Sequence, residues 1–188
     1  MSLLSKEERR ELLSIARRAI IEAIVNKIES LPLQSEGALA DLRGAFVTLK
    51  RRGRLRGCVG QPEQIDPLSH TVAHCAVSAA TEDPRFSPVK AQEISELEIE
   101  ISALTPLVPV TLEEIEIGRH GLLVQQGRAH GLLLPQVPVE RKWDAMRFLE
   151  ETCEKAGLPR NAWESSSTKI FAFSAEIFSE ADSGDASR

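Results

Sequence analysis

The chain has 188 residues, a formal net charge of −5 and 42% hydrophobic residues, with no tyrosine among them. This length predicts one domain or two intimate subdomains, and the core must be built mainly from Leu, Ile, Val and Ala. The acidic balance argues against a general binder of nucleic acid or of anionic membrane surfaces.

The three cysteines, Cys58, Cys75 and Cys153, form no CxxC pair and leave one without a partner, which argues against a disulfide framework. A reducing compartment suits such a chain. The first eleven residues are charged, and no apolar run approaches the length of a transmembrane helix. We therefore expect a soluble, cytoplasmic protein that does not contact a membrane.

The N-terminal region predicts a long amphipathic helix. Ser5 and Glu8 form a capping-box pattern, and apolar residues recur at helical spacing as far as Ile28. Pro32 lies just beyond this stripe. Residues 33–43 are then expected to form a polar connection.

Two strands are expected next, Phe46–Leu49 and Leu55–Gly60, joined by a hairpin turn at Gly53. The segment from Lys50 to Arg56 holds five basic residues in seven positions. It is a candidate site for RNA or phosphate. We favour a solvated hairpin tip, because short charge runs are common on exposed turns and the whole chain is acidic.

The second of these strands has the sequence Leu55-Arg56-Gly57-Cys58-Val59-Gly60. Alternation predicts Leu55 and Val59 in the core, and Arg56 and Cys58 together on the opposite face, lining a concave surface. A glycine inside a strand, as at Gly57, often marks the close approach of a ligand or of another backbone. Cys58 is either a small structural residue or a thiol activated by the nearby Arg56.

A helix is expected from Asp66, as N-cap, to about Ala80. His70 and His74 have the i, i+4 spacing of metal ligands, but no clear third ligand accompanies them. We interpret them as half-exposed histidines. The segment Asp83–Phe86 ends this helix in a proline turn, where Arg85 reaches back toward the cleft and Phe86 anchors the loop.

Leu97–Leu104 alternates as a strand, with Glu98 and Glu100 on its polar face. Two carboxylates in this arrangement suit acid/base chemistry. We favour a role as charge partners, with Arg56 held by one of them and Arg85 as a further candidate.

The C-terminal half repeats HGLLV at 120–124 as HGLLL at 130–134, which predicts a β-hairpin. A helix over about 141–156 should bury Trp143, Met146 and Cys153. A closing strand is expected over 170–178, with Phe171, Phe173 and Ile177 in register. The polar stretch 179–188 predicts a disordered tail.

LRGCVG closely resembles the LRGC-[IV]-G signature of the AMMECR domain family, whose prokaryotic members are known as AmmeMemoRadiSam system protein A. Further similar segments follow in the same order, so that the resemblance covers nearly the whole chain: Asp83–Phe86, Glu98–Leu104, Gly121-Leu122, Leu134–Val137, Trp143 and Cys153–Leu158.

The order of elements predicts an α+β fold with a largely antiparallel sheet and flanking helices. The resemblance implies two intimate subdomains within one domain, 1–178, with the LRGCVG strand near a cleft between them. We expect the main subdomain over about 1–104 plus 141–178 and the small one over about 105–140.

We expect the protein to bind a small ligand, or to serve as an accessory component, through a cleft near the LRGCVG strand. Cys58 is the candidate catalytic residue if the thiol is reactive. The resemblance implies Memo-like and radical-SAM partners, and it draws attention to Gln136. No P-loop, Rossmann fingerprint, nucleophile elbow or zinc ribbon is present, so the familiar enzyme classes are not supported. We expect no cofactor and no metal. The candidate ligand-binding residues are Arg56, Gly57, Cys58, Gly60, Arg85, Glu98, Glu100 and Gln136.

Overall fold

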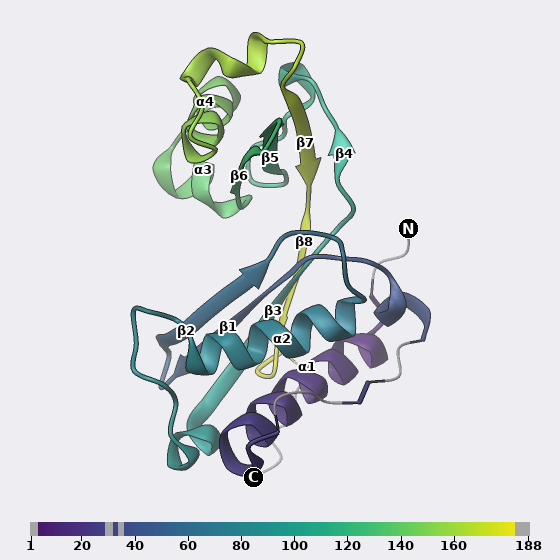
Figure 1. Cartoon of the computed structure of the whole chain (residues 1–188), viewed down its shortest axis with the longest axis vertical. Helices are drawn as coiled ribbons and strands as arrows, with labels where there is room; N and C mark the ends of the chain where they lie inside the picture. The colour runs from purple at the N-terminus through teal and green to yellow at the C-terminus, as the bar shows by residue number, and fades with distance from the viewer. Residues whose placement is uncertain (1–3, 29–31, 34–35, 183–188) are drawn as a thin grey trace. The chain divides into compact units, whose positions relative to one another are not determined.

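The structure is a computed structural model that describes residues 4–28, 32–33 and 36–182. The chain divides into two compact units: unit 1 comprises Met1–Leu104 and Glu176–Arg188, and unit 2 comprises Thr105–Ala175. Each unit contains a four-stranded sheet whose hairpins are antiparallel, with helices beside it (Figure 1). The predicted α+β fold is confirmed.

The sheet of unit 1 has the strand order β2-β1-β3-β8. Two helices pack against each other and cover one of its faces, which buries Val47, Leu49, Ile99 and Ile101 (Figure 1). The expected capping box at Ser5 begins the first of them. The elements of unit 1 are α1 (Lys6–Ile21), its π-helical continuation η1 (Glu22–Asn26), η2 (Gly37–Ala40), β1 (Ala45–Arg51), β2 (Arg54–Gln61), α2 (Leu68–Thr81), η3 (Ala91–Glu96), β3 (Leu97–Leu104) and β8 (Ala175–Ser179).

A β-bulge interrupts the hairpin β1–β2. Leu49 lies opposite Gly57 and Lys50 opposite Leu55, so Arg56 is the extra residue on β2. The bulge reverses the alternation before it, and Leu55 falls on the same face as Cys58 with 44% of its surface exposed. The prediction that Leu55 is a core residue is therefore wrong. Val59 packs against the core as expected.

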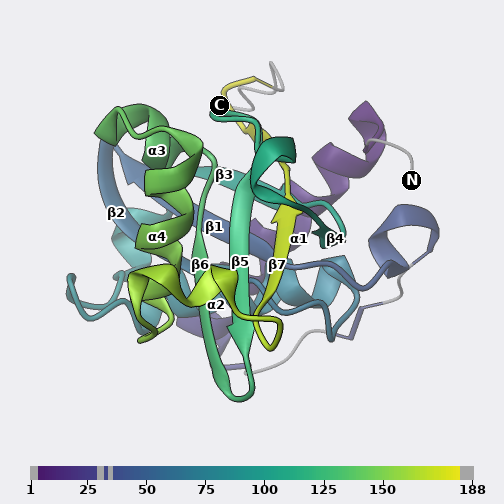
Figure 2. The same ribbon diagram turned by 90° about the horizontal axis from the view of Figure 1, so that it is seen from above.

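Unit 2 is built on the expected HGLLV hairpin. Its sheet has the order β4-β7-β5-β6, and α4 lies against β5 and β6 (Figure 2). Cys153 on α4 is fully buried beside Leu122, Val124 and Phe148. The elements are β4 (Val108–Pro109), η4 (Leu112–Glu114), β5 (Gly121–Gln126), β6 (Ala129–Leu133), α3 (Gln136–Arg141), α4 (Ala145–Lys155), η5 (Arg160–Glu164) and β7 (Lys169–Phe173).

The boundary between the units differs from the expected one. The sequence pattern places 141–178 in the main subdomain, but 141–175 belong to unit 2, because α4 packs on its hairpin and β7 pairs with β5. The expected strand 170–178 is divided at Ser174 into β7 and β8, which belong to different sheets. The division changes the alternation, and Ile177 is 55% exposed while Phe178 is buried.

Two further expectations fail at the C-terminal end. Met146 lies on the outer side of α4, with 38% of its surface exposed. Residues 179–182 are not a disordered tail, because Ser179 Oγ donates to Asp182 at 2.7 Å and Glu180 accepts from Arg17. The rest of the predicted tail, 183–188, lies outside the described residues. Within the described part of the chain, no helix is both long and apolar enough to cross a membrane.

Candidate functional site

The backbone of Cys58 is held from outside the sheet. Strand β2 is one of the two edge strands of the unit 1 sheet. The Cys58 N–H donates to Asp83 Oδ2 at 2.8 Å, and the Cys58 carbonyl accepts from Arg85 Nη2 at 3.2 Å. Unpaired edge groups of this kind are a template for another strand. The turn after α2 therefore occupies both backbone groups of Cys58 and joins the LRGCVG and DPRF segments.

Asp83 is the centre of this junction. Its side chain is only 3% exposed, and Arg85 binds it with both Nε, at 2.9 Å, and Nη2, at 2.7 Å. The backbone N–H groups of Cys58 and Arg85 donate to it as well. These hydrogen bonds, the Arg85 guanidinium first, hold the pKa of Asp83 well below its usual range. Asp83 is not among the candidates drawn from the sequence, although an Asp directly before a proline turn is a usable signal.

Arg85 is the guanidinium that lies beside Cys58. Asp83 chiefly, and Cys58 to a smaller extent, raise the pKa of Arg85. The Arg85 guanidinium also lies 5.6 Å from the centroid of the Phe86 ring. Phe86 is half-buried, so the buried anchor of this loop is Asp83 rather than the predicted Phe86.

The thiol of Cys58 lies on the sheet face opposite α1 and α2. Cys58 pairs with Thr48, which alternates along β1 with the buried Val47 and Leu49. The Thr48 hydroxyl donates to Cys58 Sγ at 3.3 Å. Cys58 is half-buried, in contrast to the fully buried Cys75 and Cys153.

Arg56 does not pair with Glu98 or Glu100, and that prediction is wrong. Its guanidinium binds both carboxylate oxygens of Glu93 on η3 at 3.1 Å and donates to the Ser87 carbonyl at 2.9 Å. The bulge explains the difference, because it removes Arg56 from the alternation that would place it beside Cys58. Arg56, the Lys90 backbone and Arg51 lower the pKa of Glu93 to about 2.

The two carboxylates of β3 have other neighbours. Glu100 accepts a hydrogen bond from Lys50 Nζ at 2.8 Å, which raises the pKa of Lys50. Glu98 lies opposite Lys50 in the β1–β3 register. Because Lys50 and Thr48 share a face of β1, this ion pair belongs to the same sheet face as Cys58.

The basic turn is an ion-pair network. Arg51 contacts Glu93 and Glu96, at 2.9 and 3.0 Å, and Arg52 contacts Glu96 at 2.9 Å. With Lys50 on Glu100 and Arg56 on Glu93, four of its five basic side chains are paired with carboxylates of the described residues. These pairs leave little unneutralised charge for a phosphate.

The two glycines of the signature serve close packing. A Cβ on Gly57 would lie 2.1 Å from the Ala79 carbonyl oxygen, so its absence lets α2 approach β2. A Cβ on Gly60 would lie 2.0 Å from the Phe46 ring. For Gly57, the approaching group is therefore the backbone of α2. Gln136 is exposed at the start of α3 in unit 2, so it does not belong to the unit that carries Cys58.

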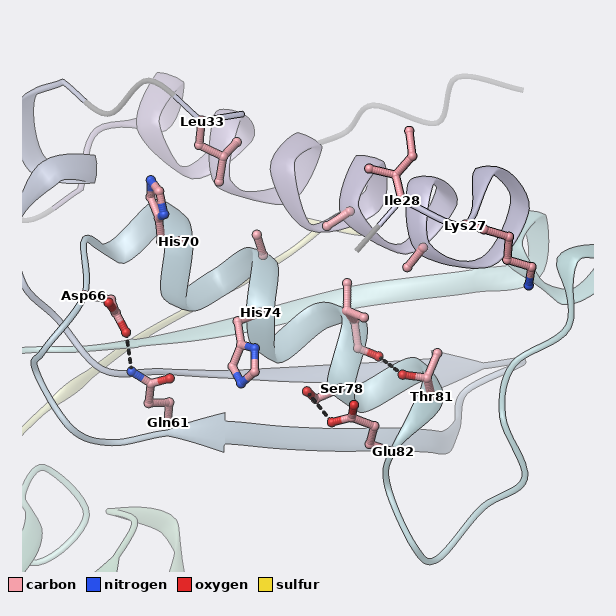
Figure 3. Close-up of a pocket in the computed structure, with 14 residues that line it drawn as sticks. Lys27, Ile28, Leu33, Gln61, Asp66, His70, His74, Ser78, Thr81 and Glu82 are labelled. Carbon is pink, nitrogen blue, oxygen red and sulfur yellow. Dashed lines mark hydrogen bonds between the residues drawn. The ribbon is translucent and has the colours of Figure 1, made fainter. Parts of the chain in front are cut away.

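A hollow of about 810 Å³ lies between α1 and α2 and reaches Gln61 at the end of β2 (Figure 3). Polar residues line it at every fourth position: Asp66, His70, His74, Ser78 and Glu82. Asp66 accepts from Gln61 at 3.0 Å and Glu82 from Ser78 at 2.8 Å. Figure 3 shows the two imidazoles pointing in different directions, that of His70 toward α1 and that of His74 toward β2. No group of three or more His, Cys, Asp or Glu within the described ranges is arranged to hold a metal ion.

Comparison with known proteins gives a consistent result. A protein from Methanothermobacter thermautotrophicus is 45% identical over 94% of this chain and 96% of its own length. A protein from Methanopyrus kandleri is 46% identical over 94% of this chain and 90% of its own length. The crystal structure of an uncharacterised protein from Pyrococcus horikoshii matches with a TM-score of 0.76 and 43% identity, covering 90% of each chain.

The AMMECR1 family profile matches residues 13–178, which include both units from the middle of α1 to Phe178 in β8. The LRGCVG and DPRF segments that meet at Cys58 both lie within this range. The chain belongs to the AMMECR1 family.

Proposed function

We propose that this protein binds a polar small molecule on the sheet face that carries Cys58, and that it works as an accessory component with Memo-like and radical-SAM proteins. The proposal rests on one observation, the difference between the backbone and the side chain of Cys58. Its backbone is fixed by Asp83 and Arg85, whereas its half-buried side chain lies on the sheet face opposite α1 and α2. Rigid backbone support of this kind is what a precise binding site requires.

The neighbouring groups indicate the chemistry of the ligand. Around the sulfur lie the Thr48 hydroxyl and the Lys50–Glu100 ion pair, and Phe46 on the same strand face adds an aromatic ring beside Gly60. Donors, acceptors and a ring edge in one patch suit a small polar molecule with a planar part.

A reactive Cys58 is the second candidate function. It is favoured by one observation, the hydrogen bond from the exposed Arg85 guanidinium to the Cys58 carbonyl, which brings a positive charge to the residue that carries the thiol. The RNA or phosphate hypothesis has less support, because the ion pairs of the basic turn compete with any phosphate.

Thiol protection provides the test. The protein is treated with iodoacetamide in the presence and absence of fractions of a polar metabolite extract, and alkylation is quantified for each cysteine by peptide mass spectrometry. Cys75 and Cys153 are 0% exposed and serve as internal controls for unfolding. A fraction that slows labelling of Cys58 alone contains the ligand, which native mass spectrometry then identifies.

The identified ligand should bind at least tenfold more weakly to protein alkylated at Cys58 and to Thr48→Val, and equally well to His74→Ala, a variant of α2 on the other side of the sheet. Equal binding to alkylated and unmodified protein would refute the proposed site. The accessory role has its own test, co-elution of the purified protein with Memo-like and radical-SAM proteins of the same genome. Failure to co-elute would remove the partners and leave the ligand site standing.

A further inference from the structure

A second hollow, independent of the Cys58 face, lies along α1 in unit 1. Its volume is about 790 Å³, and α1 contributes Arg10, Leu13, Ser14, Arg17, Arg18 and Ile21 to its lining. The opposite wall comes from Ser95, Leu97 and Glu180. Leu13 and Leu97 are buried at its base and Ile21 is half-buried, so the hollow has an apolar floor.

Two carboxylates, Glu22 and Glu180, line this hollow, and Glu180 is neutralised by Arg17. Glu180 accepts from Arg17 Nε and Nη2, both at 2.6 Å, and from the Ile99 N–H at 2.9 Å. Glu22 accepts from the neutral Asn26 amide at 2.7 Å and keeps its negative charge, so three arginines face two carboxylates in this hollow. Arg17 is likewise satisfied, because its remaining donors bind the carbonyls of Ile94 and Leu97.

Two arginines of this hollow, Arg10 and Arg18, keep their positive charge available. Both are exposed, and neither guanidinium has an ion pair or hydrogen bond with any residue that the structure describes. They lie eight residues apart on one stripe of the helix, which separates them by about 12 Å at 1.5 Å per residue. Ser14 lies midway between them, and its side chain is exposed.

We infer that this hollow is a docking surface for an acidic amphipathic helix of a partner protein. Charge complementarity requires an occupant with carboxylates, and the separation of about 12 Å matches two acidic residues about two turns apart on a helix. The apolar floor between the arginines suits Leu or Ile on the same face of that helix. In a chain of net charge −5, such a local positive surface selects its partner by charge.

The inference is tested by fluorescence anisotropy with a labelled helical peptide. The peptide has two glutamates eight residues apart and leucines between them on the same face, and a control peptide has glutamine at both positions. We expect the wild-type protein to bind the acidic peptide and to lose affinity as salt is raised. The double variant Arg10→Gln/Arg18→Gln should bind at least tenfold more weakly.

The matched control is Arg54→Gln/Arg128→Gln, which changes the net charge equally at two other exposed arginines. It should bind as the wild type does. Equal affinity of the two double variants, or equal binding of the acidic and the glutamine peptide, would overturn the inference. Binding of a labelled oligouridine through Arg10 and Arg18, with no binding of the acidic peptide, would assign the hollow to nucleic acid and also overturn it.

Discussion

The hairpins β1–β2 and β5–β6 have glycines at similar places, but their strand pairing differs. Each has a glycine with positive φ in its turn, Gly53 and Gly127, and a glycine where a helix backbone comes close, Gly57 and Gly131. The hairpin of unit 2 is regular from Leu122 to Ala129, whereas that of unit 1 contains a bulge at Arg56.

The difference lies in what holds the outer strand. Strand β6 is covered by α4, and its residues follow plain alternation over an apolar core. Strand β2 is packed against α2 in the same way, but it is also held by side chains from elsewhere, Glu93 on Arg56 and the Asp83–Arg85 pair on Cys58. Apolar packing preserves the register that the sequence pattern predicts, and specific polar contacts at an edge strand override it.

The largest effect is expected where a helix backbone passes a glycine. Gly57→Ala should lower the free energy of unfolding by more than about 3 kcal/mol, because the new Cβ would lie 2.1 Å from the Ala79 carbonyl, which cannot move alone. Gly131→Ala should be similarly severe, since its Cβ would lie 2.3 Å from the Ala156 nitrogen. Urea titrations followed by far-UV circular dichroism measure both.

Tryptophan fluorescence, measured in the same titrations, reports the unfolding of unit 2, because Trp143 and Trp163 both lie in that unit. Gly127→Ala is the matched control. Nothing lies within 4 Å of its Cβ, and only its φ of +59° opposes the substitution, at a cost of about 1 kcal/mol. An unchanged urea midpoint for Gly57→Ala would contradict the close packing of α2 on β2.

Next in size is Asp83→Asn, which we expect to cost about 2 to 3 kcal/mol at pH 7, because it breaks a buried charged hydrogen-bond network. The pKa of Asp83 is lowered in the folded state, so its stabilisation is present above about pH 4 and is lost as pH falls through that lowered pKa. The difference between wild type and variant should therefore be largest at pH 7 and should shrink below about pH 4.

Urea midpoints at pH 7, 5 and 3 measure this dependence. Asp144→Asn is the control from unit 2, where the carboxylate caps α4 by accepting from the Arg147 N–H at 2.8 Å. This exchange should cost less than about 1 kcal/mol, since Asn is a good N-cap. A difference for Asp83→Asn that stays constant from pH 7 to 3 would show that the carboxylate charge is not involved.

A smaller effect separates the two arginines of the signature region. Arg85→Ala should slow alkylation of Cys58 at pH 7 by about threefold, because an exposed neighbouring charge contributes only a fraction of a kcal/mol. Arg56→Ala should leave the rate unchanged, because the bulge removes Arg56 from the alternation that carries Cys58, whereas Arg85 contacts the Cys58 carbonyl. The rates come from iodoacetamide labelling across a pH series. A slower rate in Arg56→Ala with an unchanged rate in Arg85→Ala would mean that Arg56 lies beside the thiol, as strand alternation predicts.

The smallest effect is expected at Leu55. Leu55→Ser should change the free energy of unfolding by less than about 0.5 kcal/mol, since the side chain is 44% exposed beyond the bulge. Leu122→Ala, in the regular hairpin, should cost about 2 to 5 kcal/mol because Leu122 is fully buried. Thermal denaturation compares the two. A large loss at Leu55 would mean that the bulge does not form.

The local sequence pattern was enough to predict several features of this structure. The capping box at Ser5, the HGLLV hairpin and the buried Cys153 follow from interactions between near neighbours or from simple alternation, and the structure has all three. The LRGCVG segment identified the family, which the profile match confirms.

What only the tertiary structure decided is which charges meet. Arg56 is 37 positions from Glu93, and Asp83 is 25 positions from the Cys58 N–H that donates to it. Alternation along a strand predicts which side chains share a face. A single bulge at Arg56 changes the face of the residues before it, and the division between β7 and β8 at Ser174 changes the face of Ile177. The period of a strand is a local property, whereas its partners, and therefore its bulges and breaks, depend on long-range packing.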